Sequence, residues 1–144
     1  MAEKRKPRKT WIITDPIHQV MNFGTEPKLR ACLTAVIDTR TFQRLRRISQ
    51  LGLTSYIFPG ATHSRFSHSL GAAYLARSVL LHLRERAEEK NRKEIDEHFN
   101  DVIIAALLHD VGHGPFSHSF EHVLKKAYKW APEHEDWAHT LISS

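Results

Sequence analysis

Histidine is abundant in this sequence and stands beside carboxylates and glycine-rich turns. The densest group lies in Leu107-Leu-His-Asp-Val-Gly-His-Gly-Pro-Phe-Ser-His118. His109 and Asp110 follow an apolar run, where an ionisable pair is costly unless its charge is compensated. Imidazole nitrogen and carboxylate oxygen suit Mn, Fe, Zn or, less comfortably, Mg. Taken alone, the pair is explained at least as well by a helix-terminal histidine beside a capping aspartate.

A second polar cluster, His63-Ser-Arg-Phe-Ser-His68, opens a long apolar-periodic segment upstream. A helix beginning there would deliver a histidine ligand from its first turn, and Arg65 would offer a planar guanidinium fork for a phosphate. The alternative is a helix-start histidine that faces water. The two clusters together indicate a site, although neither does so alone.

The elements that must position these residues are predicted to be helical. The apolar spacing predicts an all-α fold of about six helices. Tyr56, Phe58, Phe66, Tyr74, Phe116 and Phe120 are expected to be core residues. In the first half of the chain we expect helices over 28–37 and 41–48, a loop or short extended piece over 50–61, and a long helix from Ser67. An exposed helix end and connector should follow over 84–97, and then a helix over 101–109 that is capped by Asn100 and buried on most sides. Two further helices are expected over 116–129, opened by Pro115, and over 132–141.

Length and charge favour a single domain with a basic leader. The chain has 144 residues and a formal net charge of +5, and domains commonly run to roughly 100–150 residues. We expect residues 1–10, rich in Lys and Arg, to be a disordered leader and residues 11–144 to be the domain. Binding of nucleic acid through the leader and Arg40–Arg47 is the weaker alternative.

The cysteine content and the hydropathy of the sequence indicate where in the cell the protein is expected. Cys32 is the only cysteine, so an internal disulfide is excluded. No apolar run reaches the roughly 20 residues of a membrane span, and the N-terminus does not resemble a secretory signal. We therefore expect an intracellular protein with no membrane partner. It would be cytoplasmic, or nuclear if the organism is a eukaryote.

Several strings, in their order and spacing, resemble the HD-domain phosphohydrolases, specifically their deoxynucleoside triphosphate triphosphohydrolase branch. The resemblance covers roughly residues 11–144 and implies an HD-domain helical bundle, truncated on its C-terminal side. The strings are Asp15-Pro-Ile-His18, Ile37-Asp-Thr39, Phe42-Gln-Arg-Leu-Arg46, Gln50-Leu-Gly52, Phe58-Pro-Gly-Ala-Thr-His63, Arg65-Phe-Ser-His-Ser-Leu-Gly71, the segment 107–118 quoted above, and His134-Glu135.

The resemblance implies roles for individual residues. The divalent metal ligands would be His68, His109 and Asp110, with a fourth aspartate from a later helix; after Asp110 the only Asp is Asp136, beside the His-Glu motif. The catalytic residues would be His134 as the candidate acid, Glu135, His113 and His118, and the substrate-binding residues Gln50, Arg65, His113 and His118. Asp38, Gln43 and Arg46 would match a nucleotide activator pocket, although Trp11 and Thr14 depart from the usual residues nearby.

The activity implied by the resemblance is metal-dependent hydrolysis of a deoxynucleoside triphosphate (dNTP) to a deoxynucleoside and triphosphate. One alternative is a non-catalytic nucleotide-sensing or regulatory module. Another is an HD phosphodiesterase or nucleotidase that acts on a different phosphoester or on nucleic acid. A homo-oligomer is expected by analogy with the family.

Overall fold

The computed structural model describes residues 10–143 and confirms the helical fold. The predicted leader, apart from Thr10, lies outside the described residues. No described helix is long and apolar enough to cross a membrane. In chain order the elements are β1 (Ile12–Asp15), β2 (Gln19–Asn22), α1 (Pro27–Ile37), α2 (Arg40–Gln43), the 3-10 helices η1 (Arg44–Arg47) and η2 (Thr54–Tyr56), α3 (Arg65–Arg86), α4 (Glu89–Leu108), α5 (His118–Ala127) and α6 (His134–Ser143).

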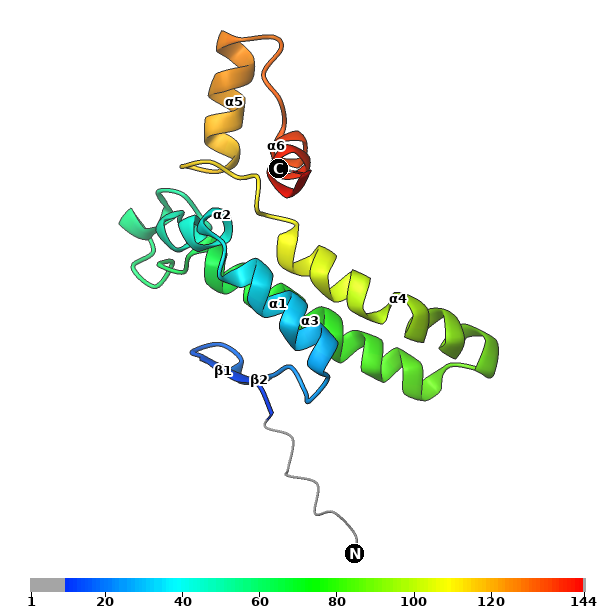
Figure 1. The fold of residues 1–144 in the computed structure, drawn as a ribbon. Coiled ribbons are helices and arrows are strands. Elements are labelled where there is room, and N and C mark those ends of the chain that lie inside the picture. The colour runs from blue at the N-terminus through cyan, green and yellow to red at the C-terminus, as the bar shows by residue number, and fades with distance from the viewer. Residues whose placement is uncertain (1–9, 144) are drawn as a thin grey trace, which may run out of the picture.

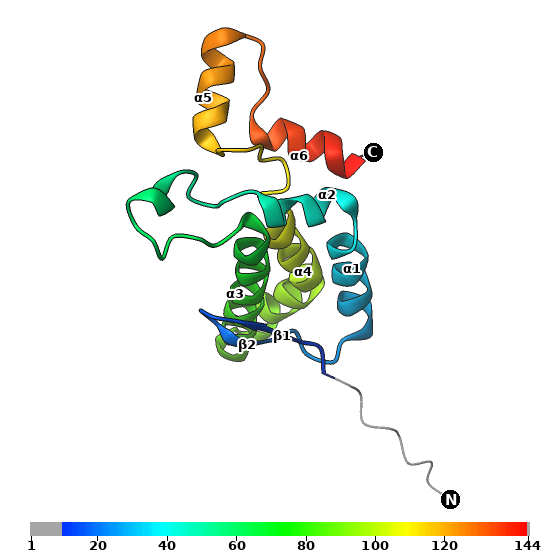
Figure 2. The same ribbon diagram turned by 90° about the vertical axis from the view of Figure 1, so that its left-hand side faces the viewer.

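The long helices α3 and α4 form an antiparallel pair, with α1 packed along them and α5 and α6 beyond the end where α4 stops (Figures 1 and 2). Apolar side chains from these elements and from α2 and η1 form the core. This arrangement brings the first turn of α3 next to the last turn of α4. The fully buried members are Leu33, Phe42, Leu45, Ala73, Ile103 and Leu107.

The start of α3 is fixed by a cap. The Ser64 side chain accepts a hydrogen bond from Ser67 N at 3.3 Å, which satisfies one of the free N–H groups of the first turn. Arg65 N donates to Ile48 O at 2.8 Å, so the cap is also anchored to the chain after η1. The helix therefore begins at Arg65, two residues before the predicted start.

Helix α4 begins earlier than its apolar run. The sequence predicted a helix capped by Asn100, but α4 starts at Glu89, because Glu, Lys and Arg are good helix formers even on exposed turns. The ion pair of Arg84 Nε with Asp96 Oδ1 at 2.5 Å joins this polar turn to α3. The expected connector is thus mainly helix, although it is exposed as predicted.

The apolar end of α4 is less buried than predicted. Val102 is 42% exposed, and Ile104 and Leu108 line an open cavity of about 740 Å³ together with Ala138 and Ile142 of α6. The prediction of burial on most sides is wrong because α3 covers one face of α4, whereas α6 covers the opposite side incompletely.

A β-hairpin that the sequence did not lead us to expect precedes α1. β1 and β2 pair antiparallel, with Ile13 opposite Met21. Asp15 Oδ1 accepts hydrogen bonds from Ile17 N at 2.8 Å and His18 N at 2.9 Å, an arrangement that closes the turn. The His18 ring packs edge-on against a tyrosine of α3 at 5.6 Å, which attaches the hairpin to the helical pair.

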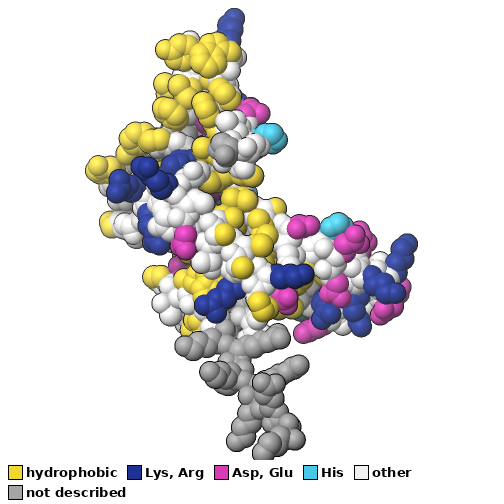
Figure 3. Space-filling model, in the orientation of Figure 1, with side chains coloured by type: hydrophobic (Ala, Val, Ile, Leu, Met, Phe, Trp, Pro, Cys, Tyr) yellow, Lys and Arg dark blue, Asp and Glu magenta, His cyan; other side chains and the backbone are white. Residues whose placement is uncertain are grey.

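Four of the six aromatic residues expected in the core lie at the surface. Phe66 is buried and Tyr74 packs against the core. The exposed fractions are 86% for Tyr56, 64% for Phe58, 55% for Phe116 and 39% for Phe120. These four belong to the segment after η1 or to the region around α5, which project from the helical pair, and Figure 3 shows hydrophobic side chains gathered over α5 on the visible face.

Candidate metal centre and histidine cluster

The three predicted metal ligands come together where α3 begins and α4 ends. His68 Nε2 lies 3.2 Å from His109 Nε2 and 3.4 Å from Asp110 Oδ2. His109 Nε2 lies 3.3 Å from Asp110 Oδ1. Ligands bound to one ion at about 2.0–2.2 Å are roughly 3.0–3.5 Å apart, so the three side chains have the spacing of a shared ion. We call this group the metal trio.

The hydrogen bonding of His109 and the lowered pKa of His68 also suit an ion. His109 Nδ1 donates to Ala106 O at 2.8 Å, because a carbonyl oxygen can only accept, and this leaves the Nε2 lone pair facing the trio. Burial lowers the pKa of His68, and the neighbouring His109 and Arg65 lower it further, against the opposing effect of Asp110. Two imidazoles beside one carboxylate form a donor set for a divalent transition metal.

Arg65 is engaged inside the site. It is 2% exposed, its Nη1 lies 2.5 Å from Asp110 Oδ2, and its Nε donates to Ser117 Oγ at 2.9 Å. Asp110 Oδ2 is buried and makes no hydrogen bond of acceptable geometry, so its contact with Arg65 is a buried ion pair beside the metal trio. Substrate phosphate binding by Arg65 stays a prediction.

A strained turn places the start of α5. Phe116 and Ser117 have φ values of 60° and 54°. Positive φ values are uncommon for residues with a Cβ, and the residues that adopt them tend to cluster at functional sites. Helix α5 therefore begins at His118, and the prediction that Pro115 opens it is wrong. The buried Ser117 hydroxyl accepts from Arg65 and lies 3.4 Å from Ser49 O, which fixes the turn.

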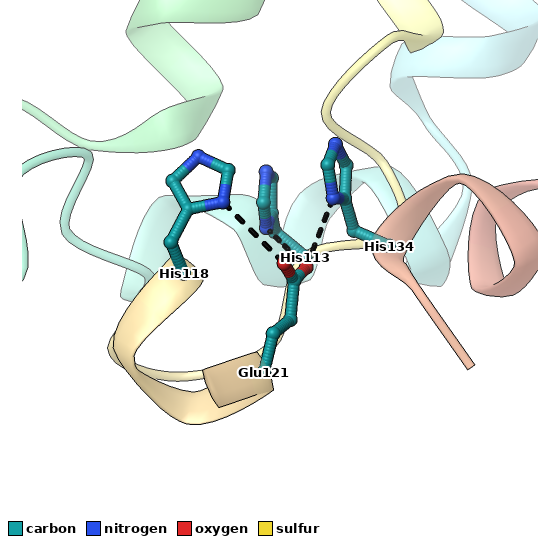
Figure 4. Close-up of side chains that lie close together, drawn as sticks. All are labelled: His113, His118, Glu121 and His134. Carbon is teal, nitrogen blue, oxygen red and sulfur yellow. Dashed lines mark hydrogen bonds and ion pairs between the residues drawn. The ribbon is translucent and has the colours of Figure 1, made fainter. Parts of the chain in front are cut away.

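A second group of ionisable side chains lies on the other side of His113 (Figure 4). Glu121 is at its centre: its Oε1 is 3.0 Å from His134 Nδ1 and 3.3 Å from His113 Nδ1, and its Oε2 is 3.4 Å from His118 Nδ1. These four residues, from the α4–α5 turn, α5 and α6, are the histidine cluster. Three of them were predicted as site residues, and Glu121 was not.

His113 connects the two groups. Its side chain is 1% exposed, its Nδ1 faces Glu121, and its Nε2 lies 3.5 Å from Asp110 Oδ1. Burial lowers its pKa to about 3, with the positive charges of Arg65 and His134 adding to the effect and Asp110 opposing it. His113 is therefore a neutral imidazole, with one donor and one acceptor nitrogen between two carboxylates.

The turn that carries His113 is held from both sides. Arg44 of η1 donates from Nη1 to His113 O at 2.7 Å and from Nη2 to Val111 O. On the other side, a Cβ on Gly112 would lie 1.8 Å from His134 O, so only glycine permits this approach of α6. The His113 and His134 rings stack at 3.9 Å as a result.

The first turn of α6 holds the other predicted acidic residues. Glu135 Oε2 is 3.2 Å from His134 Nδ1, and its side chain is 66% exposed. Asp136 Oδ2 accepts from Glu133 N at 3.0 Å; it caps α6 and lies outside the metal trio. Among the described residues, the trio contains no fourth side-chain ligand.

Gln50 lies at the edge of a cavity beside the histidine cluster. The cavity has a volume of about 580 Å³ and is also lined by Gly52, Ile57 and His118. Gln50 Oε1 is buried without a hydrogen-bond partner. Gln50 therefore lines a mostly apolar cavity of the kind that binds small molecules, and its substrate-binding role stays a prediction.

The predicted activator residues are only partly assembled. Arg46 Nε donates to Gln43 Oε1 at 2.7 Å, and the Arg46 guanidinium lies 3.6 Å from the Phe66 ring centre. Asp38 is exposed at the end of α1. Trp11, one of the departing residues, packs against Phe23 with ring centres 4.9 Å apart. Activator binding stays a prediction.

Sequence reasoning missed the residues that organise the site. Glu121 follows His118 by three positions, a spacing that places two side chains on one helix face, and this spacing could have identified it. The contacts of Arg44 with the turn and the approach of α6 to Gly112 are tertiary, and no local pattern indicates them.

Comparison with known proteins identifies a family and several relatives. Residues 65–144 match the HD domain. The chain is 48% identical over 110 residues to the deoxynucleoside triphosphate triphosphohydrolase SAMHD1 of Bos taurus and of Homo sapiens, covering 76% of this chain in each case but only 17% and 16% of those proteins. It is 42% identical over 132 residues to the uncharacterized protein YwfO of Bacillus subtilis, which covers 91% of this chain and 27% of that protein. The match extends over more than half of the sequence, from Arg65 through the metal trio and the histidine cluster, and the chain therefore belongs to the HD domain family.

Proposed function

We propose that the chain carries the site of a metal-dependent phosphohydrolase that converts a dNTP to a deoxynucleoside and triphosphate. The observation that carries this proposal is the adjacency of the metal trio and the histidine cluster through His113, which faces Asp110 on one side and Glu121 on the other. One neutral residue of the histidine cluster thus contacts both a ligand of the metal trio and the central carboxylate of the cluster.

In this proposal each group has a chemical task. His68, His109 and Asp110 hold a divalent ion, which supplies charge for the phosphate oxygens and lowers the pKa of a nearby water. His134 donates a proton to the leaving oxygen, since Glu121 and Glu135 contact its Nδ1 and leave Nε2 for the substrate. His113 and His118 bind phosphate oxygens with Arg65.

The substrate class rests on the relatives and on the cavity. The bovine and human proteins are named as deoxynucleoside triphosphate triphosphohydrolases. The cavity beside Gln50 has a volume of about 580 Å³, within the range of roughly 300–1,000 Å³ found for small-molecule sites. Its apolar lining and the unpaired Gln50 Oε1 suit a base and sugar, while the histidine cluster at its edge suits the phosphates.

A substrate panel tests the proposal. The protein with Mn²⁺ is incubated with dNTPs, nucleotide monophosphates, a cyclic nucleotide and single-stranded DNA, and the products are separated by chromatography. Release of triphosphate from dNTPs supports the proposal, and hydrolysis of another member alone favours a phosphodiesterase or nucleotidase. His109→Ala should abolish the activity, whereas His122→Ala, an exposed histidine of α5 outside both groups, should retain it.

The second candidate is a non-catalytic nucleotide-sensing or regulatory module. It is favoured by the metal trio, which has three side-chain ligands among the described residues and no fourth. This reading predicts dNTP binding with no turnover of any member of the panel and no metal retained after purification. Metal analysis of the purified protein therefore separates the two functions.

Nucleic-acid binding has less support. The basic face expected over Arg40–Arg47 is reduced, because Arg44 is half-buried and bound to backbone carbonyls. A basic tail would give binding that weakens steeply with salt, and deletion of residues 1–10 should abolish it. Self-association also stays a proposal; sedimentation with and without dNTP is its test.

A further inference from the structure

The histidine cluster contains more metal-ligating atoms than proton transfer requires. We propose that His113, His118, Glu121 and His134 bind a second divalent transition-metal ion of the Zn²⁺ type, separate from an ion held by the metal trio. One potential ligand atom from each of these side chains lies within 4.8 Å of the others, and Figure 4 shows the three rings turned toward the Glu121 carboxylate.

The contacts of the Glu121 carboxylate with the three rings fall in the range found between ligands of one Zn²⁺ ion. The contacts of the Glu121 carboxylate with the three Nδ1 atoms measure 3.0, 3.3 and 3.4 Å. Four ligands bound to Zn²⁺ at about 2.0–2.1 Å are separated by roughly 3.3 Å. The rings of His113 and His134 are stacked with their centres 3.9 Å apart, and all four ligand atoms lie within 4.8 Å of one another.

Unpaired atoms in the cluster point to a cation. His113 Nδ1, Glu121 Oε1 and His134 Nδ1 are buried and have no hydrogen-bond partner, despite their short separations. Buried polar atoms are normally hydrogen-bonded, and here three atoms that make only ion-pair contacts converge. One cation in their midst would satisfy the two nitrogen lone pairs and the carboxylate charge together.

The surroundings of His113 support coordination through Nδ1. A metal-bound imidazole commonly donates its other N–H to a carboxylate. His113 Nε2 lies 3.5 Å from Asp110 Oδ1, in position for this interaction. Asp110 would then orient a ligand of the second ion while it binds the first, so that the two sites share a hydrogen-bonded link.

The donor set defines the class of ion. Three imidazoles and one carboxylate favour Zn²⁺, Co²⁺ or Cu²⁺, whereas Mg²⁺ and Ca²⁺ prefer oxygen ligands. The site is open to exchange, because the side chain of His118 is 72% exposed. One consequence, which rests on the proposed function, is inhibition: an ion bound here withdraws His118 and His134 from contact with the substrate.

The test is equilibrium dialysis of the chain against Zn²⁺, with the bound metal counted by mass spectrometry and a parallel Co²⁺ titration to detect the visible absorption of a tetrahedral site. We expect two ions per chain. His118→Ala and Glu121→Gln should each lower the affinity for the second ion by at least about 100-fold. Replacing a residue that only hydrogen-bonds to a metal ligand already lowers metal affinity by roughly 10- to 100-fold. His122→Ala, the matched histidine control on α5, should retain both ions.

The variants also separate this proposal from the function proposed above. His109→Ala should lose the ion of the metal trio and keep the ion of the histidine cluster. A second ion that survives both His118→Ala and Glu121→Gln overturns the proposal, as does a wild-type chain whose single ion is lost in His109→Ala. Stoichiometry does not depend on turnover, so a lack of hydrolysis contradicts the proposed function alone. Circular dichroism of each variant verifies that the helical fold is retained.

Discussion

Gly112 is the point at which α6 meets the turn between the metal trio and the histidine cluster, and Gly112→Ala tests whether this contact positions the site. The added Cβ would lie 1.8 Å from His134 O and 2.6 Å from Ala138 N. Both are backbone atoms that no side-chain rotation can move. Ordinary contact begins at 3.4 Å, so α6 must retreat by about 1.6 Å, a small-to-large change of the kind that costs roughly 1–3 kcal/mol.

This retreat breaks the histidine cluster. His134 Nδ1 is 3.0 Å from Glu121 Oε1, and the displacement moves it beyond the roughly 4 Å range of an ion pair. A misplacement of 1 Å in a catalytic group can reduce the rate by about 100-fold. We therefore expect triphosphate release to fall by at least about 100-fold, while the ion of the metal trio, whose ligands lie on α3 and at the end of α4, remains bound.

Gly60→Ala is the matched control, because a Cβ at Gly60 meets nothing within 4 Å. The assays are steady-state kinetics with a dNTP, metal content after dialysis, and thermal unfolding. The reasoning is refuted if Gly112→Ala is as active and as stable as Gly60→Ala. Loss of the metal of the trio in Gly112→Ala would also contradict it, because the two groups would then not be separable.

Three further predictions concern the surroundings of the site. Arg44→Met removes two hydrogen bonds to the carbonyls of Val111 and His113, each worth about 1.5–3 kcal/mol for a charged donor; chemical unfolding should show the loss, and an unchanged midpoint would contradict it. Removing the bound metal with a chelator should lower the midpoint of thermal unfolding, since an ion at 100 times its Kd contributes about 2.7 kcal/mol of stability. The midpoint of His109→Ala should change less on addition of the chelator. The folded protein keeps His113 neutral, whereas the unfolded chain protonates it below about 6.5, so stability should fall as the pH drops from 6.5 toward 3; a pH dependence equally steep in His113→Asn would rule out this residue as a cause.

The metal trio was predictable because its ligands stand at helix ends that the sequence marks. Ser64 begins α3 and the apolar run of α4 stops before His109. The helical pair then needs only an antiparallel arrangement to bring His68 and His109 together. Resemblance to a known family supplied the choice among the histidines, which periodicity alone left open.

The errors have physical causes as well. The polar turns of α4 were expected to be a connector because they lack apolar positions, yet a helix extended from a packed segment needs only good helix formers and pairs such as Arg84–Asp96. The hairpin depends on a turn closed by Asp15 and on packing against α3. Burial of Tyr56 or Phe58 depends on what covers them, which the local sequence does not specify.

Coupling between the two groups follows from the short segment that carries both. His109, Asp110 and His113 lie within five residues, and that segment is fixed by Arg44 on one side and by α6 on the other. Asp110 contacts Arg65, His68 and His113 at once. Any change in its charge therefore alters the electrostatic interactions in both groups. An ion that neutralises Asp110 would weaken its attraction for Arg65 and free that guanidinium for a phosphate. Binding of the ion of the metal trio and binding of the substrate are thus expected to reinforce one another through a single buried carboxylate.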